Sequence, residues 1–594
     1  MPADFNQLDN FFMSSKKEPE KPSRFSLFSL ISSAKKWFEK RFPSRKQILF
    51  LPRLLSNSER RILVLLIVIA VSSFVSMPIV AYYNNTVSTA DYGGSWTEGM
   101  IGRPQHINPV LVQANDVDSD IAKLIYSGLM RYDGNGILIN DLAEYYTISD
   151  DGLLYTFKLR ENLTWHDGMP ITADDVAYTI ATTQNIDFAS PQRGAWFGIE
   201  VTKLDNLTIT LKLKNRYAQF LQNATLGILP KHIWEPVKPA NFPLFEKNLK
   251  PVGSGPYKFS KLIRSTDGMI ESYEMVAFDK FSLGKPFISK IILKFYSCEL
   301  ESECANNTIS AYNNGDIEGI STVSSQNINL LRHRGQINIM GIKMPRYFAI
   351  FFNQSNSLPL SDKSIRTALQ FATDKNKLVK DIVGGRGMIV DSPLLPEILD
   401  IPHPKEPYLF NSEKAKSLIS GKQLPITIEL TTSSNLAELP KLAEEIKSQW
   451  ESIGVTVNIR TMTISEILQV IKNRSYEALL FGESLSVDPD PFSFWNSSEK
   501  KEPGLNLAIY DNKEADKILA EARQIMDRDA RFAKYDEFQN IVMNDSPAVF
   551  LYSPDYIYIQ PKKIKNYTAT LVNVPSNRFD TVHTWYIDTQ RKSR

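Results

Sequence analysis

The longest uninterrupted apolar stretch of the chain occupies residues 62–81, with the sequence ILVLLIVIAVSSFVSMPIVA. A helix rises about 1.5 Å per residue, so this stretch would extend about 30 Å, enough to cross a bilayer once. Two arginines precede it and Tyr82 and Tyr83 follow it, residue types that favour membrane interfaces. We therefore predict a transmembrane helix over residues 62–83 rather than a buried core helix.

The same stretch is a poor match to a cleaved signal peptide, whose apolar region is about 7–15 residues long and follows a short basic segment. Here some sixty residues come first, the sequence SFVSM is a weak cleavage site, and no cysteine follows for a lipid anchor. An uncleaved signal anchor is the interpretation that we favour over a cleaved leader.

Residues 1–61 contain thirteen Lys/Arg and six Asp/Glu, a net charge of +7. Positive flanks stay in the cytoplasm, so we predict a basic, cytoplasmic, partly disordered segment and an extracytoplasmic remainder. Residues 25–42 mix aromatic and basic side chains, which fits an amphipathic helix on the inner leaflet or a solvated basic tail. The whole chain carries +2, so the remainder carries −5 and gives no basic face for nucleic acid.

After a polar linker over residues 84–91, the pattern changes to alternating helix-like and strand-like periods, which predicts an α/β protein. Residues 172–183 open with a Thr cap and two Asp residues, as helices do. A strand at 426–431, a helix at 436–450 and a strand at 455–459 form a βαβ-like unit. The other elements that we predict are strands at 154–159, 208–213 and 549–558, and helices at 122–130, 515–526 and 530–543.

Catalytic and metal-binding motifs are weak in this chain. It contains neither H-E-x-x-H nor G-x-S-x-G, and its six histidines form no pair at helical spacing. We therefore predict neither an enzyme nor a metal or other cofactor. The two cysteines, Cys298 and Cys304 in CELESEC, suit a disulfide in an oxidising compartment better than a zinc site, because no histidine is near.

Five segments, in order, resemble the extracytoplasmic solute-binding proteins of peptide ABC importers, known as family 5 or cluster C. They include VGSGPYKF at 252–259, FFNQSNSLPLSDKSIRTALQFATDKNKLV at 351–379 and DPDPFSFW at 488–495. The other two lie at 126–175 and 530–552. Most of their glycines suit turns, so the segments indicate the fold more strongly than the site.

The resemblance implies a two-lobed periplasmic-binding-protein type 2 fold, with an extra subdomain in the first lobe and one transmembrane helix before it. Lobe one would comprise 92–133, 251–343 and 555–594, the inserted subdomain 134–250, and lobe two 344–554. The hinge crossings would then fall near Met344 and Pro554.

In that family a strand of lobe two pairs with the peptide backbone, and an Asp in a Gly-Trp-x-x-Asp region holds the peptide ammonium. Here Gly482 matches the Gly, but Glu483 replaces the Trp, and the Asp position falls on Ser486 or Val487. The usual ammonium anchor is thus in doubt, with Glu483 and Asp488 as substitutes. By the same resemblance, the other residues expected at the ligand are Glu98, Trp196, Tyr347, Phe352 and Asn353.

The resemblance implies a membrane-anchored receptor that binds short peptides in a cleft between the lobes and delivers them to the permease of an ABC importer. Two alternatives remain open at this point. One is a ligand-binding sensor that is not coupled to transport, and the other is a receptor for another solute, such as a nickel chelate or a sugar.

Overall fold

The computed structural model describes residues 55–112, 115–298, 301–422, 425–434, 436 and 438–593. The predicted basic segment 1–61 lies almost entirely outside this range, and so does the amphipathic helix considered for residues 25–42. The chain forms two compact units, one of which contains helix α3 and the other Thr89–Gln590.

Helix α3 (Asn57–Asn85) contains the whole predicted transmembrane stretch. A capping box starts the helix: the Ser56 hydroxyl accepts a hydrogen bond from the Glu59 amide, and the Glu59 carboxylate accepts one from the Ser56 amide at 2.8 Å. Pro78 lies within the helix. Among the described residues, α3 alone is long and apolar enough to cross a membrane. Part of the predicted linker 84–91 is strand β1 (Thr86–Ala90).

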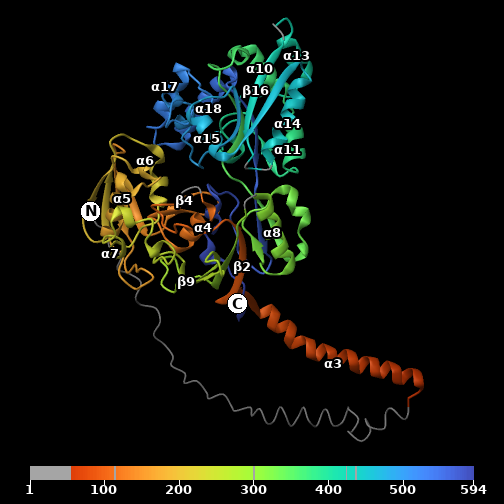
Figure 1. Ribbon diagram of the computed structural model, residues 1–594. Coiled ribbons are helices and arrows are strands. Elements are labelled where there is room, and N and C mark those ends of the chain that lie inside the picture. Colours follow the sequence, from red (N-terminus) through yellow and green to blue (C-terminus); the bar gives the residue numbers. More distant parts are fainter. Residues whose placement is uncertain are drawn as a thin grey trace, which may run out of the picture. The chain divides into compact units, whose positions relative to one another are not determined.

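Lobe one is built on a mixed seven-stranded sheet (Figure 1). Its strands in spatial order are β13 (Ile337–Ile342), β20 (Tyr556–Pro561), β12 (Gly319–Ile320), β2 (Gly93–Ile101), β11 (Ile288–Tyr296), β10 (Ile270–Ala277) and β9 (Tyr257–Arg264). The central strand β2 is parallel to both of its neighbours. Helices α4 (Asp116–Ile125) and α8 (Glu301–Asn314) belong to this lobe.

Lobe two is built on a six-stranded sheet. Its strands in spatial order are β15 (Gly387–Ile389), β19 (Ala548–Pro554), β14 (Arg346–Phe352), β18 (Ala478–Ser484), β16 (Ile426–Ser433) and β17 (Val455–Met462). Helix α14 (Glu438–Glu451) connects β16 to the parallel strand β17, which confirms the predicted βαβ unit.

Helices cover both faces of the sheet of lobe two (Figure 1). One core packs α10 (Lys363–Ala372), α11 (Lys375–Ile382), α13 (Ser412–Ile419) and α14 against one face. The other core packs α17 (Lys513–Ala522) and α18 (Arg528–Asp545) against the opposite face. Strand β14 serves both cores, because Ile350 and Phe352 enter the first and Tyr347, Ala349 and Phe351 enter the second.

The inserted subdomain has its own core around the antiparallel sheet β5 (Ala143–Ile148), β6 (Leu154–Leu159), β8 (Thr208–Lys212) and β7 (Glu200–Lys203). Helix α5 (Ala173–Gln184) packs on it, and the predicted Thr172 is its N-cap. A hairpin of β3 (Met130–Tyr132) and β4 (Leu138–Asn140) and the 3₁₀ helix η2 (Ala218–Thr225) lie beside these elements.

Two predicted elements differ from the structure. The helix expected over residues 122–130 is α4, which begins at Asp116 and ends at Ile125. The continuous strand expected over residues 549–558 is two strands, β19 and β20, which belong to different sheets on either side of Asp555. The chain makes its other passage between the sheets from β13 to β14, across residues 343–345. Periodicity does not reveal the break, because every residue from Ala548 to Pro561 except Pro554 and Asp555 is buried.

Candidate functional site

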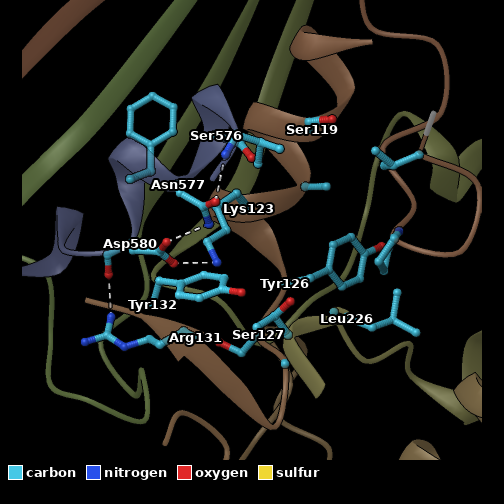
Figure 2. Close-up of a pocket in the computed structure, with 18 of the residues that line it drawn as sticks. Ser119, Lys123, Tyr126, Ser127, Arg131, Tyr132, Leu226, Ser576, Asn577 and Asp580 are labelled. Carbon is cyan, nitrogen blue, oxygen red and sulfur yellow. Dashed lines mark hydrogen bonds and ion pairs between the residues drawn. The ribbon is translucent and has the colours of Figure 1, made fainter. Parts of the chain in front are cut away.

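A cavity of about 690 Å³, here called the main cavity, lies where lobe one meets the inserted subdomain. Its walls come from α4, from the end of the chain around the 3₁₀ helix η8 (Pro575–Phe579), and from η2 with the residues after it. Figure 2 shows Lys123, Tyr126 and Ser576 among its lining side chains. The apolar part of the wall includes Val112, Trp196, Leu226, Phe281 and Phe579.

Most of the charged groups in the main cavity have partners within the protein. Lys123 forms an ion pair with Asp580, which also accepts a hydrogen bond from Asn577 at 2.7 Å, and Arg131 donates to the Asp580 carbonyl (Figure 2). Burial raises the pKa of Asp580, and the charge of Lys123 offsets part of that rise. Asp141 is another buried acid whose pKa is raised by burial and lowered in part by Arg131 and Lys123.

A second cavity, of about 280 Å³, is lined by residues of both lobes. Lobe one contributes the end of β2, the start of α4 and part of α8, and lobe two contributes β14, α14 and the passage after β19. Asp116 lines both the second cavity and the main cavity. The two cavities therefore adjoin at this carboxylate.

Arg346 is the first residue of β14, and it lines the second cavity together with Phe348. Its Nε is buried and has no hydrogen-bond partner among the described residues. Burial lowers the pKa of Arg346, and the negative charge of Asp116 raises it again in part. Asp116 is exposed to solvent, yet desolvation by the surrounding protein raises the pKa of its carboxyl group. The positive charges of Arg578 and Arg346 lower that pKa in part.

Glu98 lies behind α4, completely buried in β2. Its carboxylate accepts hydrogen bonds from Arg578 at 2.6 Å and from Tyr558 at 2.9 Å. Arg578 also binds Asp120 of α4 through both of its terminal nitrogens, at 2.8 and 2.6 Å. Burial raises the pKa of Glu98, and it raises the pKa of Asp120 to about 7. Glu98 lines neither cavity and instead fixes the cavity-lining helix to the sheet.

Tyr347 and Glu483 form a cross-strand pair between β14 and β18. The Tyr347 hydroxyl donates to Glu483 at 2.7 Å inside the second core of lobe two, next to Trp495. Burial raises the pKa of Glu483 to about 8, so its acid form is favoured at neutral pH. Gly482 pairs with Phe348, and a Cβ there would contact the Phe348 ring.

Phe352 is a core residue, and the buried Asn353 amide donates to the Arg474 carbonyl at 2.9 Å. The structure brings Tyr347, Gly482 and Glu483 together on adjacent strands but places none of them on either cavity.

Trp196 does line the main cavity, where its ring packs edge-on against Phe220 at a centroid distance of 6.0 Å. Asp488 does not line that cavity, and its carboxylate accepts hydrogen bonds from Arg531 at 2.8 and 2.9 Å. Its carbonyl accepts a hydrogen bond from Gln222, a cavity residue, at 2.6 Å.

The loop of lobe two around Asp488 thus forms a contact with the inserted subdomain. Further hydrogen bonds there run from Gln219 to the Pro489 carbonyl and from Tyr217 to Asp490. The same loop also contacts lobe one, because the Val487 amide donates to Asn573 at 2.8 Å. Elsewhere, Cys298 and Cys304 are joined in a disulfide. No cluster of three or more His, Cys, Asp or Glu side chains that could hold a metal occurs among the residues that the structure describes.

Asp116 and Arg346 were not among the residues predicted from the sequence. For Arg346 the signal was present in RYFAIFF, because the alternating directions of strand side chains place Arg346 on the face opposite Tyr347. For Asp116 no signal was available, because DVDSD presents three similar carboxylates whose partners depend on tertiary contacts.

A family model, a curated relative and solved structures all relate this chain to bacterial solute-binding proteins. The model of the bacterial extracellular solute-binding proteins, family 5, matches residues 138–506. The oligopeptide-binding protein AppA of Bacillus subtilis is 28% identical over 504 residues, which cover 80% of this chain and 89% of that protein. Its structure with a nonapeptide gives a TM-score of 0.68, at 26% identity, over 84% of this chain and 100% of AppA.

Two further solved structures extend the comparison. The ABC transporter substrate-binding protein CtaP of Listeria monocytogenes gives a TM-score of 0.74 at 25% identity, over 84% of this chain and all of CtaP. NikZ of Campylobacter jejuni, in complex with Ni(L-His), gives a TM-score of 0.68 at 25% identity, over 82% of this chain and 99% of NikZ.

Proposed function

Because the chain belongs to the family 5 bacterial extracellular solute-binding proteins, we propose that it is an extracytoplasmic receptor for short peptides, anchored by α3, that serves an ABC importer. The observation that carries the proposal is the pair of adjoining cavities, which meet at Asp116 and draw their walls from both lobes and the inserted subdomain.

The proposed ligand site extends from the main cavity past Asp116 into the second cavity. Together these spaces hold several amino-acid residues, and the apolar walls favour side-chain contacts of low specificity. A bound peptide would shift the population of the receptor towards a closed state in which both lobes contact the ligand.

The eight residues predicted from sequence take two kinds of role in this proposal. Trp196 contacts the ligand from the inserted subdomain. The remaining residues support the walls of the cavities. Glu98 fixes α4 through Arg578, and the hydrogen bond between Tyr347 and Glu483 joins β14 to β18. Asp488 belongs to the loop that contacts Gln222. Gly482, Phe352 and Asn353 shape the same strands.

The role of α3 in the proposal is to keep the receptor near its permease, which raises the effective concentration of one for the other. The helix is compatible with this role by length and composition. A membrane helix would equally suit an anchored sensor. The transport assay below therefore distinguishes a transport receptor from a sensor.

The test uses the full chain in detergent micelles, incubated with a pool of two- to nine-residue peptides and then washed and analysed by mass spectrometry. We expect retained peptides and a rise in the melting temperature, because ligand binds only the folded state. A protein that retains no peptide, but is stabilised by a nickel–histidine chelate or a sugar, would contradict the peptide assignment. Loss of peptide uptake on deletion of the gene tests the coupling to transport.

A further inference from the structure

We propose that Arg591 and Lys592 form a binding site for the headgroups of anionic phospholipids at the outer end of helix α3. The inference rests on the anchoring role proposed for α3 and goes beyond it. It gives the receptor a second contact with the bilayer, made by a segment that lies far from the helix in sequence.

The outer end of α3 has no charged side chains of its own. The apolar stretch ends at Ala81, and the sequence YYNNTVS at residues 82–88 contains neither an acid nor a base. The last turn of the helix likewise has no basic residue. The carbonyl groups that end a helix carry a partial negative charge, which a nearby cation stabilises. This end of α3 can therefore accept a cation from another part of the chain.

Arg591 supplies that cation. It lies in strand β21 (Thr589–Ser593), which pairs with β1, and it belongs to the same compact unit as α3. Its Nε donates a hydrogen bond to the Thr86 hydroxyl at 2.8 Å. Its Nη2 donates to the carbonyls of Tyr83 and Thr86 at 3.2 Å each. Arg591 therefore binds the end of the helix although it follows Tyr83 by 508 residues.

The aromatic contacts of Arg591 fix its depth along the helix. Its guanidinium carbon lies 4.1 Å from the centroid of the Tyr83 ring and 5.6 Å from that of the Tyr82 ring. Tyrosines at the end of a transmembrane helix lie at the level of the lipid headgroups. If α3 crosses the bilayer, Arg591 is therefore held at the level of the lipid phosphates.

Arg591 and Lys592 both keep donors that the protein does not use. Every hydrogen bond that the Arg591 side chain forms with a described residue is to a neutral oxygen, and none involves its Nη1. Lys592 is exposed and forms no ion pair with any residue that the structure describes. A guanidinium binds phosphate oxygens through paired hydrogen bonds, and an ammonium adds a compact charge beside it. Together the two side chains suit a negatively charged phosphodiester.

The other basic side chains described in this compact unit, Arg60 and Arg61, lie at the opposite end of α3. They belong to the flank that we expect in the cytoplasm. Basic residues close to a membrane helix in sequence set its orientation. Arg591 and Lys592 lie outside that range and reach the outer end of α3 only when the chain folds. They can therefore bind the outer leaflet without opposing the orientation signal.

The experiment measures how fast Lys592 reacts with a water-soluble acetylating ester in the full chain reconstituted in vesicles. One kind of vesicle is phosphatidylcholine alone, and the other also contains phosphatidylglycerol. The measurement has to be local, because residues 1–61 carry +7 and attract anionic lipid by themselves. Mass spectrometry of the peptide that follows Trp585 gives the extent of reaction. The internal reference is Lys513, an exposed lysine of the other compact unit.

Lys592 of the unmodified protein should react about 5-fold more slowly in the anionic vesicles, because a basic side chain gains about 1 kcal/mol at such a surface. Lys513 should react equally fast in both kinds of vesicle. Arg591→Gln frees the end of β21 from Tyr83 and Thr86 and should reduce the difference at Lys592 to less than about 2-fold. The matched control, Arg332→Gln at an exposed position of lobe one, should keep the full difference.

Melting temperatures show whether the variants are folded. Equal rates at Lys592 in both kinds of vesicle, or an undiminished difference in Arg591→Gln, would overturn this inference and leave the proposed peptide binding intact. Inorganic phosphate that slows the reaction equally in phosphatidylcholine vesicles would identify a free anion as the ligand and would also overturn it. Release of the unmodified protein from the vesicles at alkaline pH would contradict the proposed anchor itself.

Discussion

Arg578 donates a hydrogen bond to Glu98 at 2.6 Å although both side chains are completely buried. The two residues are far apart in sequence, and Asp120 of α4 joins them through the same guanidinium. This contact ties the end of the chain and the cavity-lining helix to the central strand of lobe one.

Replacing Arg578 with Ala should therefore destabilise the protein strongly. The change leaves the Glu98 and Asp120 carboxylates buried without their cation, which typically costs about 3–5 kcal/mol. Urea unfolding of the full chain in micelles, followed by tryptophan fluorescence, measures the loss. Arg332→Ala, at an exposed position, should change the free energy of unfolding by less than about 0.5 kcal/mol. Equal effects of the two changes would show that the buried contact is unimportant.

Glu483 should make stability depend on pH. Its pKa is raised from 4.5 to about 8 in the folded protein, so between these values the folded state holds a proton that the unfolded state releases. Its contribution to the free energy of unfolding should consequently fall as pH rises from about 4.5 to about 8 and become constant above that range.

Glu483→Gln stays neutral and should remove this part of the pH dependence. Urea unfolding at pH 5, 7 and 9 checks the slope for both proteins, and Glu451→Gln on the exposed side of α14 serves as the control. A Gln variant with the same slope as the unmodified protein would contradict the assignment.

Because Glu483 lies in the core, we also expect this substitution to affect the binding of peptides with free and with acetylated amino termini alike.

Arg523 holds Asp490 with hydrogen bonds of 2.6 to 3.0 Å, and Asp490 accepts a further bond from Tyr217 of the inserted subdomain. Arg523→Ala should weaken peptide binding about 5-fold, because losing about 1 kcal/mol from this contact lowers the population of the closed state.

Isothermal titration calorimetry with a retained peptide measures this effect. Lys517→Ala removes an exposed ion pair on α17 and should leave the affinity unchanged. An unchanged affinity in Arg523→Ala would show that the contact does not contribute to closure.

Helix α3 should hold the full chain in the membrane. Arg at the centre of a transmembrane helix costs about 2.5–3.5 kcal/mol per residue, so the double change Ile69→Arg and Phe74→Arg should release the protein from membranes at alkaline pH. The control, Ile69→Leu with Phe74→Leu, should remain in the membrane pellet. A released Leu variant, or a mature chain that starts after α3, would contradict the anchor.

The local sequence determined those helices and strands whose polar and apolar residues follow a clear periodicity or cap. The uncharged stretch within α3, the Thr172 cap of α5 and the β16–α14–β17 unit each follow from periodicity and capping over short spans. The family motifs then indicated the two lobes, because their order along the chain is specific even where each motif alone is weak.

Only the tertiary structure decided which polar residues have partners. Glu98 and Asp116 are both carboxylates near the start of lobe one. Glu98 is buried and is bound by Arg578 from a distant part of the sequence, whereas Asp116 is exposed. Tyr347 and Arg346 are neighbours in sequence, but the strand directs one into the core and the other to the cavity. The sequence by itself therefore determined the fold and an apolar helix long enough to cross a membrane, whereas long-range contacts determined which charged side chains are paired within the protein.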